Sequence, residues 1–160
     1  IERSEDSRNS YVSDALSQLG IISKDQSRWG LSSSGKSMGE IDIRIEEKDG
    51  NFLTFYEGIN LPYLNKNTIT SHIEKIINKY DALGVSEKFL GCYCTSTDFY
   101  NLSNIYFEFI NNFRHESIKF TDIIDVTTEF TNRTELKIFK TYYYKSERKI
   151  SLTHILINLQ

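Results

Sequence analysis

Two carboxylates on a predicted β-hairpin, Asp42 and Glu57, are the side chains of this sequence best suited to chemistry. Asp42 lies on the first strand, over residues 39–45, and Glu57 lies on the second, over residues 52–57. Asp49-Gly50 predicts a two-residue turn between them, and pairing centred on that turn sets Asp42 directly opposite Glu57. Opposed side chains have Cβ atoms roughly 5 Å apart, so the two carboxylates repel each other unless a positive charge lies between them. Because a hard divalent cation such as Mg²⁺ takes oxygen ligands, the pair predicts half of a metal site.

The alternative is that both carboxylates point into water and tolerate each other. Isoleucines at every second position predict that one face of the first strand packs on a core: Ile41, Ile43 and Ile45. The other face carries Asp42 beside Arg44, across from Phe55. Charged and apolar side chains on one face favour partial burial, where an unpaired acidic pair would be costly. This pattern favours the metal site over the exposed pair.

Length and composition limit the class of protein. The chain has 160 residues, which is typical of one domain over residues 1–160, and 39% are hydrophobic. The net charge of −3 weakens a nucleic-acid partner without excluding it, because a local basic patch can suffice. Cys92 and Cys94 are too few for a disulfide framework or a zinc site and are expected to be reduced, buried thiols. The chain shows no signal peptide and no long apolar run, so a cytoplasmic protein without membrane contact is expected. It begins with Ile1, which leaves open a domain cut from a longer protein or a processed product.

Periodicity predicts a helix before the hairpin, over residues 4–19, that ends at Gly20. Its apolar stripe consists of Val12, Leu16 and Leu19. Glu5 points roughly the same way as that stripe, as a candidate accessory carboxylate or, alternatively, as a charge that stabilises the helix start. Residues 23–39 are expected to form a polar loop.

A second helix is predicted after the hairpin, over residues 68–83, with His72, Lys75 and Lys79 on one face. A strand over residues 89–94 and a helix capped by Asp98 follow. The last two strands are expected to form a hairpin around Ser146-Glu147. This order predicts an α/β fold with a mixed sheet flanked by helices.

The loop contains a phosphate-binding pattern, G-x-x-x-x-G-K-S, over residues 30–37. That motif needs a buried strand before it and a helix directly after it. Here a polar segment precedes it and a strand follows, so nucleotide hydrolysis is not expected. Arg28 and Lys36 would still contact a phosphate backbone if the loop lies beside the metal site; the alternative is a solvated connection.

The hairpin, together with the helices around it, resembles the PD-(D/E)XK nuclease superfamily, and more closely a bacterial subset of antiphage-defence proteins. The segments that carry the resemblance are Asp25-Gln26-Ser27-Arg28-Trp29-Gly30, Ser34-Gly35-Lys36, Gly39-Glu40-Ile41-Asp42, Tyr56-Glu57-Gly58-Ile59-Asn60-Leu61 and His72-Ile73-Glu74-Lys75. It runs from about Glu5 to Tyr80, half of the chain. It implies a restriction-endonuclease-like mixed β-sheet flanked by helices.

The resemblance also implies roles for single residues. Asp42 and Glu57 would be ligands of Mg²⁺ or Mn²⁺, with Glu5 as an accessory carboxylate and Glu40 as a further candidate ligand. The lysine of the family belongs two residues after the glutamate, where this chain has Ile59. Either Lys75 or Lys36 would then replace it, or the domain is catalytically inactive; a plain solvated Lys75 remains the alternative.

These roles predict a metal-dependent nuclease that hydrolyses phosphodiester bonds. DNA is the expected substrate, and a bacterial defence effector is the expected role. Phosphate contacts are expected from the basic side chains around the carboxylates: Arg28, Lys36, His72, Lys75 and Lys79. The alternative is a catalytically inactive nuclease-fold module that binds nucleic acid or a protein, and Ile59 favours it. A third interpretation is a nucleotide switch built on Lys36. Likeness to the family further implies a homodimer and a fused or associated sensor or NTPase module.

Overall fold

One mixed β-sheet runs through the protein in a computed structural model that describes residues 4–25, 41–80 and 84–160. Its seven strands lie in the order β1-β2-β3-β4-β7-β6-β5. The strands are β1 (Ile22–Asp25), β2 (Ile43–Glu46), β3 (Phe52–Leu61), β4 (Glu87–Cys94), β5 (Asp122–Asp125), β6 (Leu136–Lys145) and β7 (Arg148–Asn158). The helices are α1 (Glu5–Gln18), α2 (Lys66–Glu74), the π-helical η2 (Lys75–Tyr80), α3 (Phe99–Asn111) and α4 (Thr127–Phe130). The predicted α/β fold with a mixed sheet flanked by helices is confirmed.

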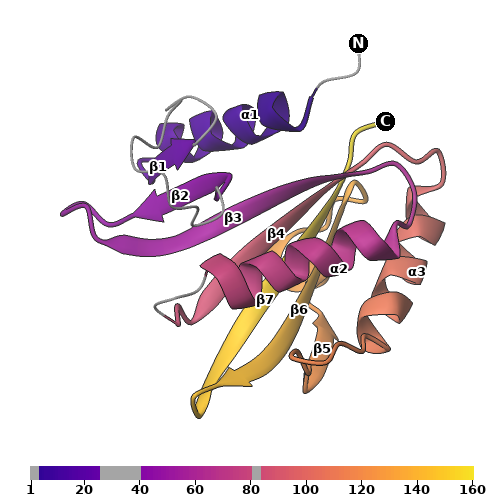
Figure 1. Cartoon of the computed structure of the whole chain (residues 1–160). Coiled ribbons are helices and arrows are strands. Elements are labelled where there is room, and N and C mark those ends of the chain that lie inside the picture. Colours follow the sequence, from indigo (N-terminus) through magenta and orange to yellow (C-terminus); the bar gives the residue numbers. More distant parts are fainter. Residues whose placement is uncertain (1–3, 26–40, 81–83) are drawn as a thin grey trace.

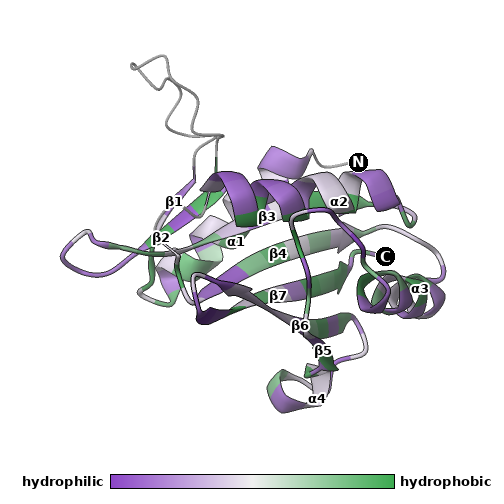
Figure 2. Cartoon of the chain, turned by 60° about the horizontal axis from the view of Figure 1, so that its bottom comes forward, coloured by the Kyte–Doolittle hydropathy of each residue, from purple (hydrophilic) through white to green (hydrophobic). Residues whose placement is uncertain are grey.

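Helices cover both faces of the sheet (Figure 1). Alternation along β3 sends Phe55, Ile59 and Leu61 into the larger core, which α2 and α3 close. Tyr56 faces the other way, into a smaller cluster against which Val12 and Leu16 of α1 pack. Figure 2 shows α2 running along the hydrophobic central strands of the sheet. The hairpin therefore lies between two packed layers.

The β2–β3 hairpin has the predicted register at its far end but not the predicted turn. Ile43 pairs with Tyr56 and Arg44 pairs with Phe55, as expected from a turn centred on Asp49-Gly50. The loop is longer, however, because Glu47 donates its N–H to the carbonyl of Asn51 at 2.9 Å and Gly50 has φ 83°. A register shift between Ile45 and Glu46 leaves one extra residue on β3 and cancels the difference.

The apolar face predicted for β2 holds only in part. Ile43 and Ile45 lie in the α1-side cluster, whereas Ile41 packs against the larger core on the α2 side. Because regular pairing of β2 begins at Ile43, the alternation does not extend back to Ile41. This irregular start puts Asp42 at the edge of the ladder.

Helix α1 forms as predicted and packs the predicted face on the sheet, except at its last residue. The Oγ atom of Ser4 caps it by accepting the N–H of Ser7 at 3.2 Å, and Gly20 follows with φ 79°. Leu19, expected in the apolar stripe, is 78% exposed because the helix ends at Gln18. The residues of α1 that are buried are polar, Asn9 and Ser13.

The segments around the hairpin differ from the predictions in detail. Strand β1 occupies the start of the predicted loop over 23–39 and pairs antiparallel with β2; residues 26–39 lie outside the described part. The helix predicted over 68–83 begins at Lys66, where Asn65 caps it, and becomes π-helical at Lys75.

The last part of the chain agrees closely with the sequence. Strand β4 is parallel to β3, and Cys92 and Cys94 are buried free thiols, as expected. The hairpin of β6 and β7 turns at Ser146 and Glu147, both with positive φ. No helix among the described residues is long and apolar enough to cross a membrane.

Candidate functional site

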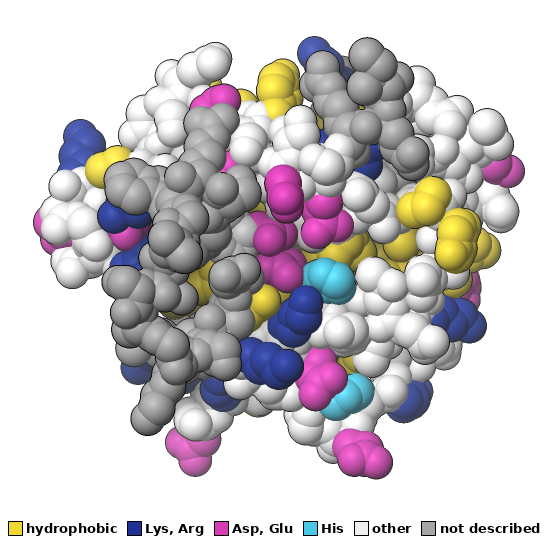
Figure 3. All heavy atoms as spheres, turned by 45° about the horizontal axis from the view of Figure 1, so that its top comes forward, with side chains coloured by type: hydrophobic (Ala, Val, Ile, Leu, Met, Phe, Trp, Pro, Cys, Tyr) yellow, Lys and Arg dark blue, Asp and Glu magenta, His cyan; other side chains and the backbone are white. Residues whose placement is uncertain are grey.

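An open pocket of about 320 Å³ lies where α1, the β2–β3 hairpin and the second helix meet. Its lining consists of Glu5, Asp42, Glu57, His72, Lys75, Lys79 and Tyr80. Figure 3 shows acidic side chains gathered at the centre of this face, with a histidine and basic side chains beside them. Every predicted site residue that the structure describes lines this pocket, and among the described lining residues Tyr80 alone was not indicated by the sequence. Three further predicted site residues, Arg28, Lys36 and Glu40, lie outside the described residues.

Asp42 is fixed to the second strand of the hairpin. Its Oδ2 atom accepts the backbone N–H of Gly58 at 2.7 Å. Burial raises the pKa of Asp42 to about 6; the Gly58 N–H and a hydrogen bond from Asn9 oppose the shift, while the charges of Glu5 and Asp6 add to it. The carboxylate is therefore held in place at a partly desolvated position.

Glu57 is the most buried carboxylate of the pocket, at 3% exposure. Its Oε2 atom has no hydrogen-bond partner within the described part of the chain. Burial, then the charge of Asp42, raises the pKa of Glu57 to about 8, against the opposing charge of Lys75. A buried carboxylate oxygen without a partner is costly, so this atom has a free coordination position at the floor of the pocket.

His72 faces Glu57 from helix α2. Its Nε2 atom lies 3.8 Å from Oε1 of Glu57, and its Nδ1 atom lies 2.9 Å from the carbonyl of Thr68. Burial lowers the pKa of His72, so the ring is neutral at pH 7. A neutral ring makes only a weak contact to a phosphate compared with the lysines of the same helix.

Glu5 joins the first turn of α1 to strand β3. Its Oε2 atom accepts the backbone N–H of Asn60 at 3.0 Å, while Ser4 provides the helix cap. Arg8, one turn later, donates to the side chain of Asn60. Glu5 is thus attached to the strand that carries Glu57, and it lines the rim of the pocket.

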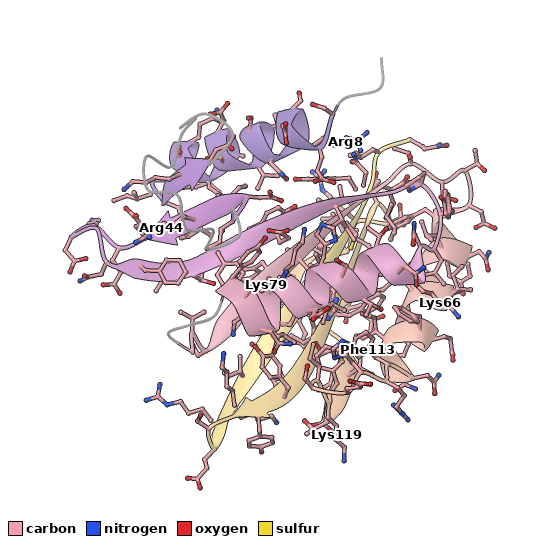
Figure 4. The ribbon with its side chains drawn as sticks, in the orientation of Figure 1. Arg8, Arg44, Lys66, Lys79, Phe113 and Lys119 are labelled. Atoms are coloured by element: carbon pink, nitrogen blue, oxygen red, sulfur yellow. The ribbon has the colours of Figure 1, made fainter. Side chains whose placement is uncertain are left out.

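Ile59 stands where the family that the sequence resembles has a lysine. Ile59 is fully buried among the residues beneath α2. Lys75 and Lys79 come instead from η2 and line the pocket beside Glu57. Figure 4 shows Lys79 at the hairpin end of the second helix and Lys66 at the opposite end.

A buried hydrogen-bond chain leads to Asp42 from the α1 side of the sheet. The hydroxyl of Tyr56 donates to that of Tyr93 at 3.1 Å, and Tyr93 donates to Oδ1 of Asn9 at 2.7 Å. Asn9 in turn bonds to Asp42. Sequence reasoning did not assign a role to Asn9 or Tyr93; the position of Asn9 on the inward side of α1 was the available signal.

Two glycines make room for this chain. A Cβ atom at Gly58 would collide with the side chain of Asn9, and one at Gly91 would collide with the ring of Tyr56. The glycines therefore permit close packing of α1 on the sheet at the pocket.

The pocket suits a hard cation that needs few protein ligands. Among residues 4–25, 41–80 and 84–160, no three His, Cys, Asp or Glu side chains are arranged to hold a metal ion. Mg²⁺ commonly binds through one or two carboxylates and keeps several waters. Asp42 and Glu57, with the unpartnered oxygen of Glu57 in the described structure, fit that requirement.

Comparison with known proteins finds no matching family model, no matching curated protein and no matching solved structure.

Proposed function

We propose that the protein is a metal-dependent nuclease that hydrolyses phosphodiester bonds, with DNA as the first substrate to test. One observation carries the proposal: Asp42 and Glu57 share a pocket with two lysines, and Oε2 of Glu57 lacks a partner among the described residues. Two carboxylates beside basic side chains are suited to bind a cation and a phosphate together. The restriction-endonuclease-like fold and the bacterial defence role implied by the resemblance belong to the same proposal.

Each residue of the pocket has a distinct part in this proposal. Asp42 and Glu57 would hold Mg²⁺ or Mn²⁺, a cation that activates water and stabilises the charge of a leaving oxygen. Lys75 and Lys79 would bind and orient the phosphate, since they line the pocket beside Glu57. Glu5 holds α1 against β3 through the N–H of Asn60. The charge of Lys75 lowers the pKa of Glu57, so Lys75 is the residue proposed to replace the lysine missing at Ile59.

The test is cleavage of supercoiled plasmid and of labelled single strands with Mg²⁺, with Mn²⁺ and with EDTA. Wild type is compared with Asp42→Ala and Glu57→Ala. We expect metal-dependent cleavage that either substitution reduces at least about 100-fold. The matched control is Glu47→Ala, because Glu47 is an exposed carboxylate at the other end of the same hairpin. Undiminished cleavage by both Asp42→Ala and Glu57→Ala would contradict the proposal.

A second candidate is a catalytically inactive module of the same fold that binds nucleic acid or a protein. The burial of Ile59 where the family has a lysine favours it. It predicts no cleavage under any metal condition and nucleic-acid or protein binding that Asp42→Ala leaves unchanged. Replacing the lysines of η2 would weaken binding to nucleic acid. The same substitutions would leave the fold itself intact, with or without metal.

A further inference from the structure

The ring of His72 has a fixed orientation in the pocket. Its Nδ1 atom lies 2.9 Å from the carbonyl oxygen of Thr68. A carbonyl can only accept a hydrogen bond, so Nδ1 carries the proton and donates it. The lone pair of a neutral ring is then on Nε2, the atom that faces Glu57.

Two acceptor atoms thus face each other across the pocket. Nε2 of His72 and Oε1 of Glu57 are 3.8 Å apart, and Oε2 of Glu57 has no partner in the described part of the chain. A lone pair and a carboxylate at this separation need a proton or a cation between them. Two ligand atoms that bind one cation at its usual bond lengths are about 3.0 to 3.5 Å apart, so a shift of a few tenths of an ångström would let both bind.

We infer that Nε2 of His72 binds the same divalent cation as Glu57. The site would then have mixed nitrogen and oxygen ligands and would prefer first-row transition metals such as Mn²⁺, Co²⁺ or Zn²⁺ to Mg²⁺. Imidazole suits Zn²⁺ and its transition-metal neighbours, and Mn²⁺ binds nitrogen as well as oxygen ligands, whereas Mg²⁺ favours oxygen. The inference rests on the proposed function in that it concerns the same carboxylates, but it assigns His72 to the cation instead of to a phosphate.

The surroundings of His72 support a ligand role. Metal-binding histidines typically donate the other ring N–H to a backbone carbonyl or carboxylate, which fixes the ring and makes it a better ligand. The Thr68 carbonyl occupies that position, one helical turn before His72. The other two histidines lack this arrangement: both ring nitrogens of the buried His154 contact hydroxyls, of Tyr106 and Thr141, and His115 lies outside the pocket.

The experiment is electron spin-echo spectroscopy of the untagged 160-residue chain loaded with Mn²⁺, which detects ¹⁴N bound directly to the ion. Three samples are compared with wild type: protein labelled with ¹⁵N-histidine, His72→Gln and the control His115→Gln. We expect a ¹⁴N signal in wild type and in His115→Gln that disappears in the other two. Calorimetry of the same proteins should show Mn²⁺ affinity reduced at least about 10-fold by His72→Gln, with Mg²⁺ affinity changed less than about 3-fold.

The labelled wild-type sample needs no substitution, so the test holds even if His72→Gln fails to fold. Bound Mn²⁺ without a ¹⁴N signal, or a signal that persists in His72→Gln, would overturn the inference. Failure of the inference and failure of the proposed function are separable. Cleavage with a bound metal that has no nitrogen ligand would contradict only the role of His72. A ¹⁴N signal without cleavage would contradict only the proposed nuclease activity. Absence of any Mn²⁺ binding removes both.

Discussion

Asp42 and Gly58 are joined by a hydrogen bond of 2.7 Å, in which the backbone N–H of Gly58 donates to Oδ2 of Asp42. This bond attaches the irregular start of β2 to the residue that follows Glu57, so the two carboxylates keep a fixed relation although the regular ladder begins only at Ile43. The arrangement confines negative charge in a desolvated place, which is costly in the absence of a cation.

The metal-free protein should lose stability as the pH rises from 6.5 to 8.5. Glu57 ionises near pH 8 in the folded chain, against an ordinary value of 4.5. The folded state therefore binds more protons than the unfolded state in this window, and the free energy of unfolding falls with pH. We expect wild type to lose about 2 kcal/mol relative to Glu57→Gln across this range.

Urea unfolding followed by far-ultraviolet circular dichroism, with EDTA present, measures this difference. Glu47→Gln is the control, because its carboxylate is exposed and should leave the pH dependence as in wild type. Parallel curves for wild type and Glu57→Gln would show that Glu57 is ionised in the folded protein throughout this range.

Cation binding should release a proton. At pH 7 Glu57 is largely protonated and Asp42 is largely ionised, from values of about 8 and about 6. A cation bound to both must displace the proton of Glu57. We expect about one proton released per Mn²⁺ at pH 7 and less at pH 9, measured by calorimetry in buffers of different ionisation enthalpy. The same release at both pH values would contradict the role of Glu57.

The sequence predicted the pocket better than it predicted the elements that build it. Periodicities of two and of about four predicted which strand and helix faces carry Glu57, His72 and Lys75, and all three side chains line one pocket. The register at Ile43, next to Asp42, agrees with the prediction through two deviations that cancel, a longer loop and a bulge at Ile45/Glu46. Local sequence did not reveal either deviation, since bulges depend on what packs against the strand.

Other features depend on long-range packing and were not predictable. Asn9 is buried on α1 because its side chain bonds to Tyr93, 84 residues further along the chain, while Val12 and Leu16 pack on the same face. Hydropathy alone predicted that Leu19 is part of the apolar stripe, but its side chain is exposed. The π-helical turn at Lys75 likewise has no signature in the apolar pattern, which continues through it.

Lys75 should matter for cleavage and Lys66 should not. Both lie on the same helical segment, but Lys75 lines the pocket whereas Nζ of Lys66 lies 5.7 Å from the ring of Phe109; Figure 4 shows Lys66 at the end of α2 away from Lys79. Removing a charge that stabilises the transition state typically costs about 10²- to 10³-fold in rate. We expect Lys75→Gln to reduce kcat by about 100-fold and Lys66→Gln by less than about 2-fold, in single-turnover cleavage with Mn²⁺. Equal, small effects would remove Lys75 from catalysis.

Asn9 should position Asp42 from the far side of the sheet. Its Oδ1 atom accepts the hydroxyl of Tyr93 at 2.7 Å and its side chain bonds to Asp42, so Asn9→Ala removes the acceptor of the buried Tyr93 hydroxyl and one of the hydrogen bonds to Asp42. A loss of about 1 to 3 kcal/mol in the free energy of unfolding is expected.

The control is Ser13→Ala, because Ser13 lies on the same buried face but its Oγ atom meets that of Ser23 at 2.9 Å, away from the pocket. Both substitutions should destabilise the fold, whereas only Asn9→Ala should weaken Mn²⁺ binding, by about 10-fold. Calorimetry at a temperature where both variants are folded separates the two effects: a similar loss of affinity in Ser13→Ala would mean that α1 supports the pocket as a whole and that Asn9 has no specific link to Asp42.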